Sequence, residues 1–450
     1  MKLTILGGGG FRVPLVHGAL LRDTHPGRVE EVVLHDTSSD RLAVMSAVLR
    51  EQAAEARREH GATPPSLHAT TDLREAVTDT DVVFSAIRVG GAQGRTCDER
   101  VALDLGLLGQ ETTGPGGIAY GLRTIPVVMD IARTVAEVAP RAYVINFTNP
   151  AGMITQAMQQ VLGDRVVGIC DSPIGLGRRA AAALGLDPAR TSFDYAGLNH
   201  LGWLRGLRYD GRDVLPDLLA DPARLVRTEE GRLFGPEWLA TIGAIPNEYV
   251  YYYDFTREAI ASITGATQTR GEFLLRQQSA YYAAALADPD GAWRRWREVR
   301  AEREETYMAE ARAEGEERDL TDVGAEGYEQ VALSLMRAIS RGERGLMILN
   351  VRNGTTLPGL PADAVVEVPC AVDASGPRPL ATAPLTGRML GLTAQVKHAE
   401  ELTIEAALTG SRQRAVQAFA SHPLVDSVAL ARHLLDGYRA RIPGVADAVG

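Results

Sequence analysis

The segment that decides the fold is the N-terminal stretch from Met1 to Pro14, MKLTILGGGGFRVP. Lys2 to Leu6 form a short apolar run typical of a buried strand, and four glycines follow it directly. Pro14 then stands where the first turn of a helix tolerates proline. The segment therefore predicts a strand, a tight turn and a helix that begins near Arg12.

Strands and helices continue to alternate after this segment. Further buried strands are predicted over Glu31 to His35, Asp81 to Ile87, Ala142 to Phe147 and Val166 to Cys170, and an Ala-rich helix over Leu176 to Leu184. Such alternation is typical of a doubly wound parallel sheet. Residues 1–190 are therefore predicted to form a Rossmann-type NAD-binding domain within an α/β fold.

Beyond about residue 190 the alternation fades, which predicts a second, mixed α+β lobe over residues 191–450 for substrate, metal and oligomerisation. Late in the chain, MILNV and VVEVP are predicted strands joined by a turn-rich segment, and Leu392 to Leu408 an amphipathic helix. Trp293 to Asp319 is dense in charges of both signs, which favours a solvated helix or a mobile segment.

Composition and charge exclude several classes of protein. The 450 residues include 45% hydrophobic and 23% charged side chains, as in soluble globular proteins. The net charge of -10 indicates no non-specific attraction to nucleic acid or anionic membranes. The sequence lacks a secretory or membrane-spanning apolar run, so a cytoplasmic location is expected. Three widely spaced cysteines argue against a disulfide framework and leave a thiolate ligand possible.

The glycine run predicts a dinucleotide site. Without side chains, Gly7, Gly8, Gly9 and Gly10 would let backbone N–H groups approach a pyrophosphate at a helix N-terminus, and we assign Phe11 to the same site. Arg12 occupies the third glycine position of the usual fingerprint. Asp36, which closes the second strand, favours NAD over NADP because it would accept hydrogen bonds from the ribose hydroxyls. A glycine turn in an unrelated α/β protein is the alternative.

Polar residues follow the later strands, where open α/β sheets bind ligands. Asn146 and Asn149 come after one strand and could reach a substrate or the nicotinamide, although asparagine also serves in turns. Cys170 and Asp171 end the next strand, and His200 follows about thirty residues on. A thiolate and an imidazole can share one divalent metal, but a buried cysteine is also a common core residue.

Tyrosines and arginines complete the candidate site. IPNEYVYYYDF holds four tyrosines, of which one could be a base if a nearby cation lowered its pKa. The alternative is aromatic packing. Arg95 and Arg270 lie in glycine-associated segments, where a guanidinium could bind phosphate through two hydrogen bonds or remain solvated.

Eight motifs in this order make the chain resemble glycoside hydrolase family 4, specifically its 6-phospho-β-glucosidases. The likeness covers nearly the whole chain and is more specific than any single motif. The motifs are GGGGFRVP, RVGGAQGR, GQETTGPGG, NFTNPAG, GICDSP, GLNHLGW, IPNEYVYYY and NVRNGTTLPGLPADAVVEVPC.

The resemblance implies a fold like that of lactate and malate dehydrogenases, with NAD⁺ and a divalent metal, typically Mn²⁺, as cofactors. It implies Cys170 and His200 as metal ligands, and Arg95, Asn149 and Arg270 as substrate ligands. It makes a tyrosine the catalytic base, which we place at Tyr249, with Tyr251 or Tyr252 as alternatives. Asp171 is the candidate acid.

The implied reaction is an exception to the two-carboxylate rule for glycosidases. Hydride leaves carbon 3 of the sugar, a tyrosinate removes the proton from carbon 2, the aglycone is eliminated, water adds, and the hydride returns. The expected substrate is a small phosphorylated glucoside, and the expected assembly is a homodimer or homotetramer.

Three departures from the family pattern bear on these expectations. The family commonly has serine at Gly10, and DVGAEGYEQ differs from the usual glycine-rich segment. Asp171 is typical of the α-glucosidase members, whereas β-glucosidase members often carry asparagine there. We favour β because NFTNPAG and GLNHLGW look closer to that group, with α as the alternative. A 2-hydroxy-acid dehydrogenase and a non-catalytic NAD sensor are the remaining rivals.

Overall fold

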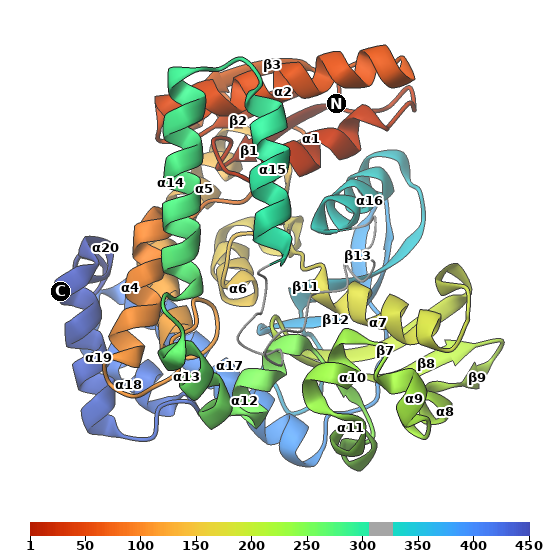
Figure 1. Cartoon of the computed structure of the whole chain (residues 1–450), viewed down its shortest axis with the longest axis vertical. Coiled ribbons are helices and arrows are strands. Elements are labelled where there is room, and N and C mark those ends of the chain that lie inside the picture. Colours follow the sequence, from red (N-terminus) through yellow and green to blue (C-terminus); the bar gives the residue numbers. More distant parts are fainter. Residues whose placement is uncertain (306–326) are drawn as a thin grey trace.

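A computed structural model describes residues 1–305 and 327–450 of the chain. Within these residues, 13 strands form one sheet, whose main path is β10-β8-β7-β12-β11-β6-β5-β4-β1-β2-β3 (Figure 1). Helices cover both faces of this sheet. The sheet is continuous across residue 190, since strands from both halves of the sequence pair with each other.

The N-terminal half of the sheet is parallel, with the strand order β3-β2-β1-β4-β5-β6. This is the doubly wound Rossmann order, so the predicted fold class is confirmed. Five of the strands lie where the sequence predicts them, and β3, whose side chains are largely exposed, was not predicted. Their bounds are β1 (Lys2–Leu6), β2 (Glu31–His35), β3 (Ser66–Thr70), β4 (Val82–Ser85), β5 (Tyr143–Asn146) and β6 (Val166–Gly168).

The second half of the sheet is antiparallel and begins where β11 pairs with β6 through Asn350 and Gly168. β12 and β7 follow, and the β7–β8 hairpin extends the sheet further. The predicted strands MILNV and VVEVP lie within β11 and β12. The bounds are β7 (Thr191–Leu198), β8 (Leu201–Tyr209), β9 (Arg212–Asp213), β10 (Ile245–Pro246), β11 (Gly345–Arg352), β12 (Val365–Asp373) and β13 (Gly376–Pro379).

Alternate side chains of the parallel strands face two separate hydrophobic clusters. In β4, Val82 and Phe84 pack into one cluster while Val83 packs into the other. The first cluster includes α1 (Val13–Leu21), α2 (Ser39–His60), α7 (Ser172–Ala183) and α16 (Tyr328–Arg341). The second includes α3 (Leu73–Val77), α5 (Pro115–Val138), α6 (Ala151–Leu162), α17 (Gly387–Thr409), α18 (Arg412–Ser421), α19 (Val428–Arg441) and α20 (Pro443–Ala448). The sheet is thus buried on both sides, as parallel sheets require.

The structure describes further helices, most of them in the second half of the chain. They are α4 (Gly91–Leu103), η1 (Gly163–Arg165), η2 (Pro188–Arg190), α8 (Leu215–Leu219), α9 (Pro222–Leu225), α10 (Glu229–Phe234), α11 (Pro236–Ile242), η3 (Glu248–Val250), α12 (Tyr251–Asp254), α13 (Thr256–Gly265), α14 (Arg270–Ala287) and α15 (Ala292–Glu305). No helix of the described residues is long and apolar enough to span a membrane.

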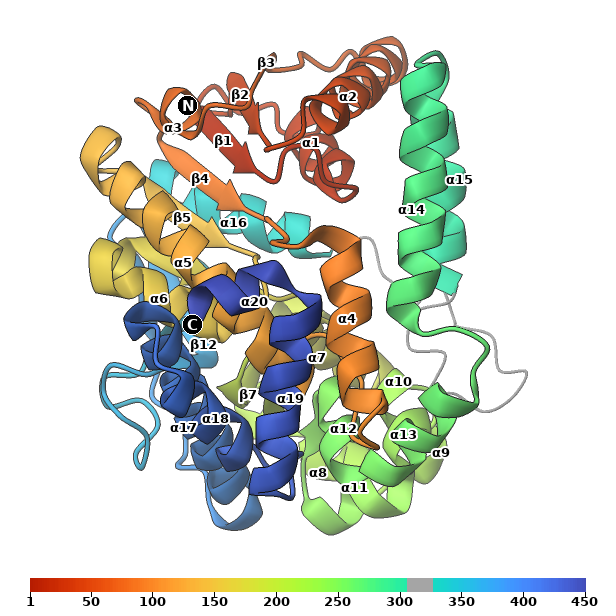
Figure 2. The ribbon, with the colours of Figure 1, turned by 90° about the vertical axis from the view of Figure 1, so that its left-hand side faces the viewer.

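Helices α14 and α15 form a hairpin that stands beside α2 (Figures 1 and 2). The sequence predicts a solvated helix or a mobile segment from Trp293, and for the inner side of α15 this prediction is wrong. Trp296 is 1% exposed, and its ring lies 5.5 Å from that of Phe11 in the glycine turn. Arg294, Arg297 and Glu298 are exposed, whereas Arg300, Arg303 and Glu304 line the cavity described below. The rest of the predicted segment, residues 306–319, lies outside the described residues.

Candidate active site

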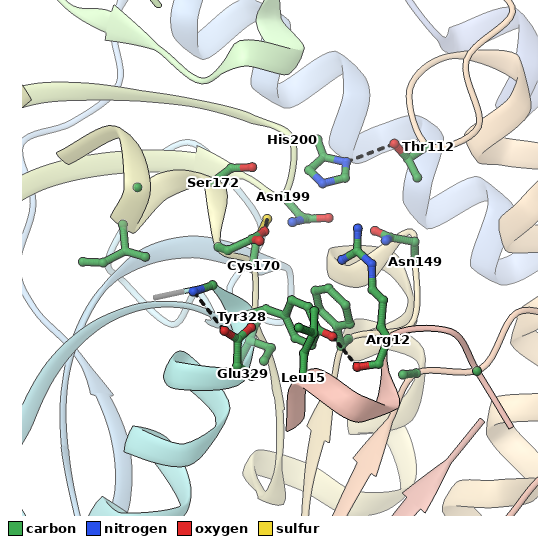
Figure 3. Close-up of a pocket in the computed structure, with 18 of the residues that line it drawn as sticks. Arg12, Leu15, Thr112, Asn149, Cys170, Ser172, Asn199, His200, Tyr328 and Glu329 are labelled. Carbon is green, nitrogen blue, oxygen red and sulfur yellow. Dashed lines mark hydrogen bonds between the residues drawn. The ribbon is translucent and has the colours of Figure 1, made fainter. Parts of the chain in front are cut away.

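The carboxyl ends of β1, β4, β5 and β6 lead to one cavity of about 2250 Å³. Residues from both halves of the sequence line it, and Figure 3 shows side chains from several elements converging on the same space. Of the predicted site residues, those that line it are Gly7, Gly10, Phe11, Asp36, Arg95, Asn149, Cys170, Asp171, His200, Tyr249, Tyr252 and Arg270. The tertiary structure therefore brings most of the predicted residues together.

The glycine turn that follows β1 is packed too closely for side chains. Gly7 has φ +81°, and a Cβ there would lie 2.6 Å from the carbonyl oxygen of Ala86. Gly8 and Gly9 do not line the cavity, because they pack against β2 and α2, where a Cβ would lie 2.7 Å from that of Leu34 and 2.6 Å from that of Arg41. The turn therefore brings bare backbone and the start of α1 to the cavity, as a pyrophosphate requires.

Asp36 connects the glycine turn to the end of β2. Its Oδ2 accepts a hydrogen bond from Gly9 N at 3.1 Å, and its Oδ1 accepts one from Ser38 N at 3.1 Å. Each carboxylate oxygen retains a further acceptor site toward the cavity. The glycine turn and Asp36 together are compatible with a bound dinucleotide whose ribose hydroxyls would donate to Asp36.

His200 lies in the two-residue turn of the β7–β8 hairpin, between Leu198 and Leu201. Its φ of +63° is a left-handed conformation that favours glycine or asparagine. A non-glycine residue in this conformation carries a backbone cost, which suggests a function for the imidazole side chain. The hairpin points this imidazole into the cavity (Figure 3).

The hydrogen bonds around His200 define which ring nitrogen can bind a metal. Thr112 donates its hydroxyl hydrogen to Gln110 Oε1 at 3.1 Å, so its Oγ1 accepts from His200 Nδ1 at 3.0 Å. Nδ1 therefore carries the proton, and Nε2 keeps its lone pair for a metal. Burial lowers the pKa of His200 to about 4, so the ring is neutral at physiological pH.

Cys170, the other predicted metal ligand, follows β6 and is 5% exposed. Burial raises the pKa of its thiol, and the nearby carboxylates of Glu367 and Asp171 raise it further. A divalent cation would supply the missing positive charge and hold the thiolate form. Among the described residues, no group of three or more His, Cys, Asp or Glu side chains could hold a metal. Two protein ligands, as the sequence predicts, would leave coordination positions for substrate oxygens and water.

The four tyrosines of the IPNEYVYYYDF segment occupy different surroundings. The ring of Tyr249 is parallel to that of His200, with the centroids 3.7 Å apart, and both rings line the cavity. Tyr252 also lines it. Tyr251 stacks on Phe255 at 5.1 Å outside the cavity lining, and Tyr253 stacks on His422. The geometry therefore leaves Tyr249 and Tyr252 as candidates for the base and places Tyr251 in the core.

The two asparagines that follow β5 have different roles. Asn146 is fully buried, and its Nδ2 donates to Thr148 O, Ala151 O and Thr155 Oγ1. Its predicted reach to a ligand is therefore wrong, because the side chain holds the following turn together. Asn149 lines the cavity and points toward the same space as Cys170 (Figure 3).

Arg95 belongs to a cluster of guanidinium groups on one wall of the cavity. It donates to Glu99 at 2.9 Å and to Glu111 at 2.6 Å, and Arg88 also pairs with Glu111. Desolvation opposes the ionisation of Glu111, but the two arginines outweigh it and lower its pKa to about 2. Glu111 therefore remains charged within the cluster, whereas desolvation raises the pKa of Glu99.

The positive charges outnumber these carboxylates. Arg270 donates to the backbone oxygen of Arg303 at 2.7 Å, and Arg12 lies close enough to interact electrostatically with Arg303. Desolvation and the surrounding guanidinium groups lower the pKa of Arg303. Mutual repulsion of this kind favours the binding of an anion such as phosphate.

Several lining residues were not predicted from the sequence. Arg12 was read only as an imperfect fingerprint position, but its guanidinium lies over the rings of Phe147 and Tyr328 at 5.3 and 5.2 Å. Thr112 and Glu111 lie in GQETTGPGG, a motif that contributes to the family resemblance but to no predicted site residue. The run of polar side chains between its glycines is the signal that could have revealed them.

Comparisons with known proteins place most of the chain in one family. The model of the family 4 glycosyl hydrolases matches residues 2–186, and that of the family 4 glycosyl hydrolase C-terminal domain matches residues 195–425. A "Probable 6-phospho-beta-glucosidase" of Bacillus subtilis is 32% identical, and the alignment covers 97% of this chain and 95% of that protein. A maltose-6'-phosphate glucosidase of Clostridium acetobutylicum is 29% identical, with 97% and 96% covered.

Two solved structures resemble the whole chain. The 6-phospho-beta glucosidase of Thermotoga maritima, in complex with NAD and glucose-6-phosphate, has a TM-score of 0.81 and 26% identity, and covers 100% of this chain and 99% of its own. A 6-phospho-alpha-glucosidase from gut microorganisms, in complex with NAD and Mn²⁺, has a TM-score of 0.81 and 25% identity, with 99% and 98% covered. The family indicated by the ordered motifs is confirmed: the chain belongs to family 4 of the glycosyl hydrolases.

Proposed function

We propose that this chain hydrolyses 6-phosphorylated glucosides, with a preference for the β-anomer, and that it uses NAD⁺ and a divalent metal such as Mn²⁺. One observation carries the proposal. A single cavity joins the glycine turn, the pair Cys170 and His200, the ring of Tyr249 and the arginine cluster. The relatives described above act on phosphorylated glucosides of both anomers, and the two solved structures contain NAD.

The arginine cluster would bind the sugar phosphate. Arg95 and Arg270 come from α4 and from the first turn of α14, and they approach the cavity from different elements. Two guanidinium groups can bind the phosphate oxygens through several charged hydrogen bonds and orient the ring. Asn149 would then contact a sugar hydroxyl.

The reacting carbons would lie between Cys170, His200 and Tyr249. When bound, the metal polarises the sugar oxygens, and NAD⁺ takes a hydride from carbon 3 and returns it later. Cys170 and His200 Nε2 would hold the metal. The phenolate of Tyr249 would remove the proton from carbon 2, since its ring stacks on the ring of a metal ligand.

Asp171 would give a proton to the leaving aglycone. It precedes α7, directly after Cys170, and it lines the cavity. A carboxyl group at this position is also the observation that favours the alternative, a 6-phospho-α-glucosidase. The two functions differ in the side of carbon 1 from which the aglycone leaves, and not in the chemistry at carbons 2 and 3.

A substrate panel tests the proposal. Aryl α- and β-glucosides, each with and without a 6-phosphate, are incubated with the chain, NAD⁺, Mn²⁺ and a reductant. We expect turnover of the phosphorylated β-glucoside, exchange of the carbon 2 hydrogen with solvent, and no net NADH. Turnover of the α-glucoside alone would select the alternative, and net NADH would indicate a dehydrogenase.

We also expect a homodimer or homotetramer, which light scattering would detect.

A further inference from the structure

Three carbonyl groups at the start of the first helix accept hydrogen bonds from aromatic side chains far away in the sequence. Tyr282 Oη donates to Gly9 O at 2.7 Å, Trp296 Nε1 donates to Phe11 O at 2.8 Å, and Tyr328 Oη donates to Arg12 O at 2.9 Å. The three donors come from α14, α15 and α16. They attach the second half of the chain to the backbone that follows β1.

These hydrogen bonds fix the orientation of the peptide groups in the turn. Each carbonyl shares a rigid plane with the N–H of the next residue, so a hydrogen bond to the carbonyl oxygen also fixes the direction of that N–H. The Gly9–Gly10 peptide is held on both sides, because Gly10 N donates to Gly7 O at 2.8 Å while Tyr282 binds Gly9 O. Anions bind to backbone N–H groups at a helix N-terminus only when those groups are correctly directed.

Tyr282 is held firmly in place for this role. Its side chain is 8% exposed, and the guanidinium of Arg41 in α2 lies 4.2 Å from its ring centre. Tyr282 does not belong to the cavity lining, whereas Trp296 does. The Tyr282 hydroxyl therefore does not contact a ligand in the cavity directly, and its hydrogen bond to Gly9 O links it to the glycine turn.

The α14–α15 hairpin that carries these donors also reaches the arginine cluster. Its far end begins at Arg270, and Gly271 N donates to Glu99 Oε2 at 2.8 Å. At the near end, Glu51 of α2 accepts from Gly291 N at 2.8 Å and from Trp293 N at 3.1 Å. Figure 2 shows the hairpin running from α2 toward the end of α4. One rigid element thus contacts both ligand-binding regions.

We propose that Tyr282 and Trp296 are positioning residues for the dinucleotide: they hold the glycine turn, and with it the N–H groups at the start of α1, in the conformation that binds its pyrophosphate. The proposal rests on the proposed function only for the identity of the ligand. Tyr328 is left out of the test because its ring stacks on Phe147 at 4.1 Å inside the cavity and would contact the substrate region directly.

The chain offers a matched control for each variant. Tyr281 is adjacent to Tyr282 and also buried, but its hydroxyl donates to Ala292 O at 3.4 Å. Trp293 lines the cavity as Trp296 does, but its Nε1 donates to Glu55 Oε2 at 2.6 Å. Replacing each of the four residues by Phe removes one hydrogen-bond donor and keeps a ring.

The dissociation constant for NAD⁺ is measured by isothermal titration calorimetry, without metal or substrate. We expect Tyr282→Phe and Trp296→Phe each to raise it about tenfold, because a buried carbonyl loses its donor and the turn its constraint. ADP-ribose, which shares the pyrophosphate, should lose affinity equally. Tyr281→Phe and Trp293→Phe should stay within about twofold of the wild type, which is the spread expected for sites without a direct effect.

The melting temperature of the NAD-free protein separates positioning from stability. Unchanged NAD⁺ affinity in Tyr282→Phe and Trp296→Phe, with or without a lower melting temperature, would overturn the proposal. Equal losses in the control variants would overturn it too. If one variant fails to fold, the other decides, since the two donors lie on different helices. Failure of the wild-type chain to bind NAD⁺ would refute the proposed function and the positioning role together, whereas normal wild-type binding with unaltered variants refutes the positioning role alone.

Discussion

Replacing Thr112 by valine tests whether the hydrogen bond behind His200 supports a metal site. Valine has nearly the shape of threonine but cannot accept the Nδ1 hydrogen that Thr112 Oγ1 accepts at 3.0 Å. The imidazole would lose the partner that fixes its tautomer and orients Nε2 toward the metal. The substitution leaves both predicted metal ligands in place.

The structure limits the size of the expected effect. Loss of such a partner typically weakens metal binding by about 10- to 100-fold. The ring of His200 would still be held in its plane by Tyr249, whose centroid lies 3.7 Å away. We therefore expect the lower end of that range, about tenfold or about 1.4 kcal/mol.

The assay is a titration with Mn²⁺ in the presence of NAD⁺, in which electron paramagnetic resonance measures free Mn²⁺. Thr113→Val is the matched control, because the hydroxyl of Thr113 is buried and has no hydrogen-bond partner among the described residues. NAD⁺ affinity should not change in either variant. Unaltered Mn²⁺ affinity in Thr112→Val, or an equal loss in Thr113→Val, would refute the reasoning.

Three further predictions concern the base, the phosphate site and acid stability. Tyr249→Phe removes a general base, so in steady-state kinetics it should lower kcat on the phosphorylated glucoside by about 10²- to 10⁴-fold and change KM little. A change in KM with kcat unaltered would contradict this role. Arg270→Met should raise KM for the same substrate by at least about tenfold, with NAD⁺ affinity unchanged, since a charged hydrogen bond contributes about 1.5–3 kcal/mol. His422 is 4% exposed, and burial lowers its pKa from 6.5 to about 3, so the folded state favours the neutral ring. Its contribution to stability is fully present above pH 6.5 and is lost by about 1.4 kcal/mol per pH unit as the pH falls from 6.5 toward 3. Urea unfolding of His422→Gln should accordingly show a weaker pH dependence below pH 6.5 than the wild type, whereas His433→Gln, at an exposed position, should not.

The local pattern of the chain was enough to predict the nucleotide-binding half of the fold. β1, β2 and the turn at Gly7 could be predicted directly from the sequence. Each strand is an apolar run that ends in glycine or in a polar residue, and this pattern involves only residues adjacent in the chain. The rule that ligands bind at the carboxyl ends of parallel strands then led to Asn149 and Cys170. The ordered motifs identified the family.

The surroundings of these residues depended on contacts that no local pattern contains. The tautomer of His200 follows from Thr112, which is 88 residues away. The inner side of α15 is buried because Trp296 meets the carbonyl of Phe11, 285 residues away, although its sequence is dense in charge. The tyrosines of the IPNEYVYYYDF segment could not be distinguished in the sequence. Only the folded backbone directs Tyr249 toward the cavity and Tyr251 toward the core.

The sequence by itself therefore determined the class of fold and the family, and it supplied most of the candidate residues for the site, because each of these is visible as a pattern among adjacent residues. Only the tertiary structure decided which nitrogen of His200 can bind a metal, which tyrosines reach the cavity and what holds the glycine turn. These properties arise from hydrogen bonds and packing between distant segments, and such partners become known only when the chain is folded.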